Sequence, residues 1–203
     1  MRFLVLFLVA ASSVLVVSCG VTRDPNAPSY EVKRKLYEAV TPEESSIKIS
    51  LWDQKAWLLN GAGEAVLQTD VATGVPGKET PTGVFPVLER LETKRSNRYG
   101  KLVDIKTREV VVAKAWEHEG PIPAGSEYEG IAMPYWMRLT WYGVGMHVGS
   151  FKKRTRSSFG CVRVFEDAQP LIFAKTQKGT KVEIVKESLV RKFGWVPKSG
   201  WLR

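Results

Sequence analysis

The residues most suited to covalent chemistry in this chain are a cysteine and a histidine, Cys161 and His147. The 203 residues contain two cysteines and two histidines. A thiolate attacks carbonyl carbon readily, and a nearby imidazole can take the thiol proton and hold an ion pair that lowers the thiol pKa. A cysteine with a histidine elsewhere in the chain is the usual sequence trace of a thiol nucleophile. The pair therefore predicts nucleophilic catalysis, with Cys161 as nucleophile and His147 as base.

The residues around Cys161 favour a catalytic turn over a buried apolar position. Cys161 follows the turn-like stretch Ser157-Ser158-Phe159-Gly160, whereas a cysteine that only fills core space normally lies within an apolar run. Gly160 lets the backbone approach a ligand closely, so the N–H groups of Gly160 and Cys161 are candidates to stabilise an oxyanion. Arg163 lies two residues further on, on the same side of a strand as Cys161. It could bind a carboxylate as a two-pronged donor or form a structural ion pair.

Two other groups of polar residues give weaker signals. Basic residues crowd the loop between base and nucleophile, which indicates either a solvated loop or attraction of an anionic substrate: Lys152, Lys153, Arg154 and Arg156. His118 stands between two glutamates and is expected in a surface loop, with a substrate contact as the alternative. The histidines and Cys161 show no metal-ligand spacing, so we expect no metal and no cofactor.

The N-terminus resembles a bacterial lipoprotein signal. A positive start, Met1-Arg2, precedes an apolar run over residues 3–17, which is short for a helix spanning a bilayer. Ser18 before Cys19 resembles a lipobox, which implies cleavage before Cys19 and lipidation of that residue; an ordinary signal peptide is the alternative. Gly20 at the next position favours the outer membrane in a host with two membranes. Cys161 then has no disulfide partner within the chain, although the compartment is oxidising.

Composition indicates one globular domain with an anionic partner. A chain of 203 residues with 44% hydrophobic content can bury one core and carry a short tail or two. The formal charge of +9 suits nucleic acid, an acidic membrane surface or a carboxylate-rich cell wall. No helix-turn-helix, zinc-finger or aromatic RNA-binding signature is present, so we expect no nucleic-acid partner.

The elements that must position Cys161 and His147 are mostly strands. Apolar residues alternate with polar ones from Ile47 onward, which predicts a half-buried strand. Asn60-Gly61 indicates a hairpin turn, lengthened by the two residues that follow. Further strands are expected at residues 56–59, 65–71, 84–88, 110–113, before and after Gly143, at 163–165 and at 181–185, with a short helix over 166–175.

The polar, proline-containing residues 20–45 are interpreted as a tether with one short helix over residues 31–40. Four side chains would share a face of that helix: Val32, Leu36, Tyr37 and Val40. Docking of this face on the domain is the alternative to a spacer. At the other end, aromatic residues such as Trp195 and Trp201 either cover a sheet edge or touch an envelope surface.

Five short blocks follow one another in the order of a known family pattern. The blocks are Thr73-Gly74 with Thr80-Pro81-Thr82-Gly83-Val84-Phe85, Met133-Pro134-Tyr135-Trp136-Met137-Arg138, His147, Ser158-Phe159-Gly160-Cys161-Val162-Arg163, and Gly179-Thr180-Lys181-Val182. In this order they resemble the L,D-transpeptidase (YkuD-type) catalytic domain. The resemblance implies a mainly β, sandwich-like fold with a short helix or two. The chain would then comprise a signal peptide (1–18), a tether (19–45), the catalytic domain (46–186) and a C-terminal tail (187–203).

The resemblance also implies roles for individual residues. His147 matches the base and Cys161 the nucleophile, and the expected substrate contacts are Arg163, Ser158, Phe159, Met133 and Tyr135. One position departs from the pattern, because the family motif reads Ser-His-Gly-Cys and this chain has Phe159 in place of the histidine. If that imidazole donates to the oxyanion, its loss costs on the order of 10²-fold in rate. If it only packs, Phe159 can fill its space.

The implied activity is peptidyl transfer on peptidoglycan stem peptides in the cell envelope. Cys161 would attack the bond between the third stem residue, usually meso-diaminopimelate, and the terminal D-Ala, forming a thioester that passes to an amine on another stem. Transfer to water would make the protein an L,D-carboxypeptidase. Impairment by Phe159 would leave a peptidoglycan-binding lipoprotein, and a purely structural lipoprotein is the remaining alternative. We expect a periplasmic monomer held to the membrane by lipid at Cys19.

Overall fold

The structure is a computed structural model that describes residues 24 and 26–193. The expected signal peptide, Cys19, Trp195 and Trp201 lie outside the described residues. The elements in chain order are β1 (Tyr30–Val32), α1 (Arg34–Ala39), β2 (Ser46–Ser50), β3 (Lys55–Leu59), β4 (Ala65–Ala72), β5 (Gly83–Pro86), β6 (Glu89–Leu91), β7 (Arg95–Asp104), β8 (Val110–Val112), the 3-10 helix η1 (Ala115–Glu117), β9 (Ser126–Ala132), β10 (Trp136–Arg138), β11 (Gly145–Val148), β12 (Val162–Val164), α2 (Gln169–Ala174), β13 (Lys181–Val185) and α3 (Val190–Phe193).

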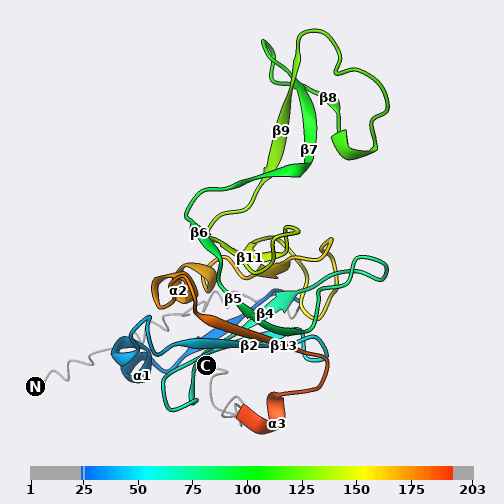
Figure 1. The fold of residues 1–203 in the computed structure, drawn as a ribbon. Coiled ribbons are helices and arrows are strands. Elements are labelled where there is room, and N and C mark those ends of the chain that lie inside the picture. Colours follow the sequence, from blue (N-terminus) through cyan, green and yellow to red (C-terminus); the bar gives the residue numbers. More distant parts are fainter. Residues whose placement is uncertain (1–23, 25, 194–203) are drawn as a thin grey trace, which may run out of the picture.

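A ten-stranded sheet forms the body of the molecule (Figure 1). Its strands follow the order β5-β13-β2-β3-β4-β12-β11-β10-β6, and β1 pairs with β4 off this path. The sheet curls so that apolar side chains from β2, β3, β4, β11, β12 and β13 enclose one main core. The prediction of a mainly β fold with short helices is therefore confirmed. No helix in the described part of the chain is long and apolar enough to cross a bilayer.

Period-two patterning correctly located the central strands. Ile47 and Ile49 of β2 are fully buried, and β2 pairs antiparallel with β3. The turn that joins β3 to β4 is the longer one that the two extra residues implied: the Asn60 N–H donates to the Glu64 carbonyl, and the Glu64 N–H donates to the Asn60 side chain. β4 is buried along its whole length because strands pair with both of its edges and the core packs against it.

Residues 30–40 belong to the folded domain, so the spacer interpretation does not describe them. β1 pairs with β4, and α1 follows it directly. The Tyr37 hydroxyl donates to the Leu171 carbonyl at 3.0 Å, and Tyr37 and Val40 are both buried. Docking on the domain, the alternative to a tether, is what the structure has for Val32, Tyr37 and Val40, whereas Leu36 of the same expected face is exposed. Burial of these side chains stabilises the segment against the domain.

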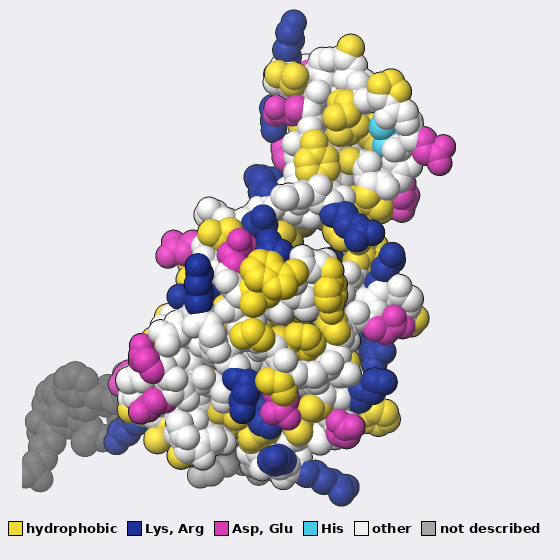
Figure 2. Space-filling view, viewed as in Figure 1, with side chains coloured by type: hydrophobic (Ala, Val, Ile, Leu, Met, Phe, Trp, Pro, Cys, Tyr) yellow, Lys and Arg dark blue, Asp and Glu magenta, His cyan; other side chains and the backbone are white. Residues whose placement is uncertain are grey.

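A second, smaller sheet projects from the body between β6 and β10 (Figure 1). We call residues 92–133 the flap. It contains η1 and a three-stranded sheet in the order β8-β7-β9. The expected strand near residues 110–113 corresponds to β8, but the two long strands β7 and β9 were not predicted. Both carry charged residues and glycines in place of regular alternation, and Leu102 and Val103 of β7 supply the buried apolar side chains of these two strands. Figure 2 shows apolar side chains on the visible face of the flap.

Candidate active site

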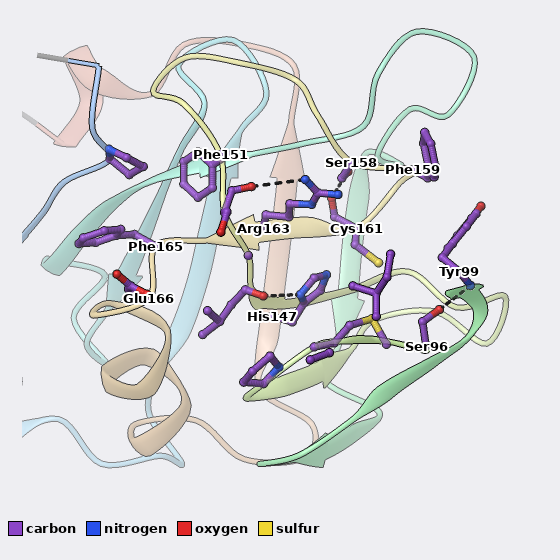
Figure 3. Close-up of a pocket in the computed structure, with 18 of the residues that line it drawn as sticks. Ser96, Tyr99, His147, Phe151, Ser158, Phe159, Cys161, Arg163, Phe165 and Glu166 are labelled. Carbon is purple, nitrogen blue, oxygen red and sulfur yellow. Dashed lines mark hydrogen bonds between the residues drawn. The ribbon is translucent and has the colours of Figure 1, made fainter. Parts of the chain in front are cut away.

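Two adjacent parallel strands bring the predicted base and nucleophile to one face of the sheet. β11 pairs with β12 so that His147 lies opposite Arg163, and Cys161 comes immediately before β12. Side chains at alternating positions of a strand share a face, which places Cys161 on the side of Arg163 and His147. All three line one cavity of about 810 Å³ (Figure 3).

Three parts of the chain build the walls of this cavity. The flap supplies one wall with Ser96, Tyr99, Trp116, Ile131, Ala132 and Met133. Another is supplied by the end of β11 and by the loop between β11 and β12, residues 149–161, which contains the predicted nucleophile and which we call the nucleophile loop. Pro28 of the N-terminal segment also lines the cavity. Met133, predicted to contact substrate, thus lines the cavity, and its contact with substrate stays a prediction. The Tyr135 ring packs edge-on against Phe173, with ring centroids 5.4 Å apart, and is not among the lining residues in the described part of the chain.

His147 is held as a neutral imidazole with a defined tautomer. Its ring is buried, and burial lowers its pKa to about 4, with the charge of Arg163 acting in the same direction. Nδ1 lies 2.7 Å from the carbonyl oxygen of Val148. A carbonyl only accepts, so Nδ1 carries the proton in this contact and Nε2 keeps its lone pair. The ring therefore presents a basic nitrogen at neutral pH.

Cys161 is a protonated thiol in this arrangement. Burial raises the pKa of the Cys161 thiol, which outweighs the opposing effects of a backbone hydrogen bond and the Arg163 charge. Its Sγ lies 3.7 Å from the carbonyl oxygen of Gly143, which accepts the S–H. The sequence predicted an ion pair that lowers the thiol pKa. The structure has a neutral thiol and a neutral imidazole instead, because burial disfavours charge on both.

The turn before Cys161 is held by its own side chains. The Ser158 hydroxyl donates to the Cys161 carbonyl and accepts the Gly160 N–H at 3.3 Å. Gly160 has φ +112°, a conformation that residues with a Cβ rarely adopt. Because the Gly160 N–H already donates to Ser158, the Cys161 N–H is the better candidate for stabilising an oxyanion. Ser158 thus serves the shape of the loop, although it also lines the cavity.

The Gly-, Pro- and Thr-rich loop between β4 and β5, residues 73–82, holds this turn in place by hydrogen bonds. The Thr80 hydroxyl donates to the Gly160 carbonyl at 2.9 Å and accepts the Gly74 N–H at 2.9 Å. A Cβ on Gly74 would lie 2.0 Å from the Lys78 carbonyl oxygen, so only glycine fits there. The Thr73 carbonyl accepts the N–H groups of Ser157 and Ser158. These blocks belonged to the family pattern, but only the tertiary contacts show their supporting role.

Arg163 presents a guanidinium to the cavity. Nη1 donates to the Ser150 carbonyl at 3.4 Å, and no ion pair of Arg163 occurs among residues 24 and 26–193. The side chain passes close to Gly149, where a Cβ would lie 2.8 Å from its Cγ. Burial lowers the pKa of Arg163, yet a guanidinium remains charged at any physiological pH. Its charge is therefore available to a ligand carboxylate.

Phe159 faces the flap and not the reacting groups. Its side chain is 47% exposed, and Figure 3 shows the ring turned from the Cys161 sulfur toward Tyr99. The Phe159 centroid lies 5.1 Å from that of Tyr99 and 6.3 Å from that of Trp116. The residue that departs from the family motif thus makes a ring contact between the nucleophile loop and the flap.

The weaker sequence signals lie away from the reacting groups. His118 is in the flap, where Nε2 lies 3.1 Å from the Pro121 carbonyl oxygen, and it is not one of the described residues that line the cavity. In the basic loop, Lys153 lies 3.6 Å from the buried carboxylate of Asp70, whereas Lys152 and Arg154 are exposed. No cluster of metal-ligating side chains occurs within the described residues.

Comparisons with known proteins identify what this chain is similar to. A family model described as the L,D-transpeptidase catalytic domain matches residues 44–184. Among solved structures, an L,D-transpeptidase from Stackebrandtia nassauensis has a TM-score of 0.52 at 16% identity, covering 74% of this chain and 60% of that one. One from Mycobacterium smegmatis has a TM-score of 0.51 at 17% identity, covering 70% and 58%. This chain therefore spans only about three fifths of those proteins. No curated protein matches the sequence.

Proposed function

Because the chain belongs to the L,D-transpeptidase catalytic domain family, we propose that it is a cysteine L,D-transpeptidase acting on peptidoglycan stem peptides. One observation carries the proposal: a thiol, a neutral imidazole and a guanidinium that forms no ion pair with the described residues line the same face of one cavity. The family supplies the substrate class. The cavity supplies a nucleophile, a base and a cationic group for a stem carboxylate.

In the first half-reaction, the Cys161 sulfur attacks the carbonyl carbon of the third stem residue. His147 Nε2 takes the thiol proton as the S–C bond forms, because partial burial disfavours a free thiolate at this position. The Cys161 N–H donates to the oxyanion of the tetrahedral intermediate. The imidazolium then returns the proton to the departing amine as the C–N bond to the terminal D-Ala breaks. A thioester on Cys161 and free D-Ala remain.

The second half-reaction determines the class of enzyme. An amine of another stem attacks the thioester and restores the thiol, which produces a crosslink. Water in place of the amine yields a shortened stem and makes the protein an L,D-carboxypeptidase. In both cases Arg163 holds a carboxylate of the donor by charge-assisted hydrogen bonds.

Mass spectrometry of the products tests this proposal. The purified full-length chain is incubated with a disaccharide-tetrapeptide, and the same protein alkylated beforehand at Cys161 is the control. We expect a thioester adduct on Cys161, released D-Ala and crosslinked dimers, all absent from the control. Tripeptides without dimers would indicate hydrolysis. Unchanged substrate and no adduct on the wild-type protein would refute an enzyme and leave a peptidoglycan-binding lipoprotein.

The orientation of Phe159 leads to a prediction for Phe159→His. An imidazole placed as the Phe159 ring is would face Tyr99, so it would not reach the oxyanion. We expect the acylation rate of Cys161 to stay equal or fall. The measurement is adduct formation by intact mass, with Phe159→Leu as the control for loss of the ring. A rise of about tenfold or more in the histidine variant alone would show that a catalytic imidazole is missing from this site.

We also propose that lipid on Cys19 anchors the protein in the cell envelope, on the periplasmic side. The support is the lipobox-like sequence before Cys19 together with a family that acts on the cell wall. Labelled palmitate should be incorporated by the wild-type chain and not by Cys19→Ala. Equal labelling of both would contradict the anchor.

A further inference from the structure

The outer part of the flap is joined to the body at very few places. No hydrogen bond or ion pair of residues 95–132 leaves the flap within the described part of the chain. Its strands pair only with one another. At its base, the Tyr135 N–H donates to the Glu92 carbonyl at 2.8 Å, which closes the connection to the body. Beyond this base, the position of the flap over the cavity therefore depends on packing between side chains of the flap and of the body.

Ring contacts supply this packing. Phe159 of the nucleophile loop contacts Tyr99 of β7 and Trp116 of η1, and these two flap rings meet edge to face with centroids 5.5 Å apart. All three side chains line the cavity that contains Cys161. We call these three rings the clasp. It joins the flap to a position two residues before the nucleophile.

An irregularity in the β7 backbone orients Tyr99 toward Phe159. The register of β7 against β9 shifts between Arg95 and Gly100, which forms a bulge. The Ser96 hydroxyl accepts the Tyr99 N–H at 2.9 Å inside this bulge. A Cβ on Gly100 would lie 2.6 Å from the Tyr128 ring, so the close crossing of the two strands requires glycine. Bulges of this kind redirect a side chain, here toward the cavity.

We propose that Phe159 is a positioning residue that fastens the flap over the active-site cavity through Tyr99 and Trp116. The clasp sets the distance between the flap wall and the wall that carries Cys161 and Arg163. A stem peptide must fit between these walls, so the clasp contributes to binding of the donor. Phe159 has an aromatic ring at this position because rings pack against Tyr99 and Trp116 without needing a hydrogen-bond partner.

The attachment of the flap can be tested without any substrate. Hydrogen–deuterium exchange of residues 95–104 and the alkylation rate of Cys161 by iodoacetamide, followed by peptide mass spectrometry, report on flap position. For Phe159→Ala we expect faster exchange and alkylation roughly 2- to 10-fold faster, the range that an aromatic pair provides. The exchange and alkylation rates of Phe159→Leu should lie between those of the wild type and Phe159→Ala, since leucine keeps an apolar side chain of similar volume. Trp52→Ala is the matched control, because Trp52 is exposed and does not line the cavity.

A double-mutant cycle shows whether the contact itself is responsible. If Phe159 acts through Tyr99, the double variant Phe159→Ala with Tyr99→Ala should increase the exchange and alkylation rates only slightly more than the stronger of the two single variants does. Additive effects, or exchange and alkylation rates in Phe159→Ala equal to wild type, would overturn the clasp. Thermal melting of each variant separates flap opening from loss of fold.

The kinetic part of this inference rests on the proposed function. With a stem-peptide donor, Phe159→Ala should raise KM roughly 2- to 10-fold and leave kcat nearly unchanged, because the ring does not touch the reacting atoms. A fall in kcat at constant KM would contradict a positioning role. If the protein shows no turnover at all, the proposed function fails, while exchange and alkylation still decide on the clasp.

Discussion

Replacing His147 by glutamine is expected to lower the acylation rate of Cys161 by about 10²- to 10⁴-fold, the range for loss of a positioned general base. The loss should be large here because burial raises the pKa of the thiol, so hydroxide or buffer cannot readily supply a thiolate. Glutamine keeps a polar side chain of similar length and can still donate to the Val148 carbonyl. The measurement is adduct formation by intact mass with stem tetrapeptide.

The pH dependence of the wild-type protein gives a second test of His147. The imidazole must be unprotonated to act as base, and burial lowers its pKa to about 4. Acylation should therefore remain level from neutral pH down to about pH 5 and fall only as the pH approaches 4. If the base were an exposed histidine with the usual pKa, the acylation rate would fall around pH 6.5. If the acylation rate of the wild type instead fell with a midpoint near pH 6.5, and His147→Gln showed no such fall, the imidazole would be less buried than in this structure.

Gly160→Ala is expected to lower both stability and acylation. Gly160 has φ +112°, which costs an alanine about 1–3 kcal/mol. Space is not the obstacle, since a Cβ there would meet Val144 Cγ2 at 3.5 Å, an ordinary contact. If the turn relaxes instead, Cys161 moves relative to His147, and a shift of about 1 Å can cost on the order of 10²-fold in rate.

Gly179→Ala is the matched control for this change. Gly179 has φ +88° with nothing near its added Cβ, and it lies in the turn before β13, away from the cavity. Both variants should unfold at lower denaturant concentration, but only Gly160→Ala should slow acylation. Equal acylation rates in the two variants would mean that the shape of the turn before Cys161 does not position the thiol.

Alternation of apolar residues from Ile47 onward, together with short apolar runs bounded by turn residues, located most strands of the large sheet, although β1 and β6 were not predicted. Residues such as Ile47 and Ile49 must face a core whatever their neighbours are, so their spacing alone indicates the element. The flap could not be found in this way. Its two long strands bury few apolar side chains, Leu102 and Val103, and carry charges at exposed positions. Their glycines are required by close contacts between strands that are distant in sequence.

The types and order of His147 and Cys161 predict a base and a nucleophile, and Arg163 offers a cationic group, because chemical reactivity belongs to the side chains themselves. Their protonation states came only from the tertiary structure. Burial lowers the pKa of His147 and raises that of Cys161, which replaces the expected ion pair by a neutral pair. Burial depends on how distant strands pack, and no local pattern records it.

Phe159 shows the same division. The sequence alone marked it as the residue that departs from the family motif, and left open a lost catalytic group or a packing role. Its ring contacts with Tyr99 and Trp116 arise where the flap meets the nucleophile loop. The sequence gives the identity of each side chain, but the tertiary fold determines which side chains distant in sequence come into contact.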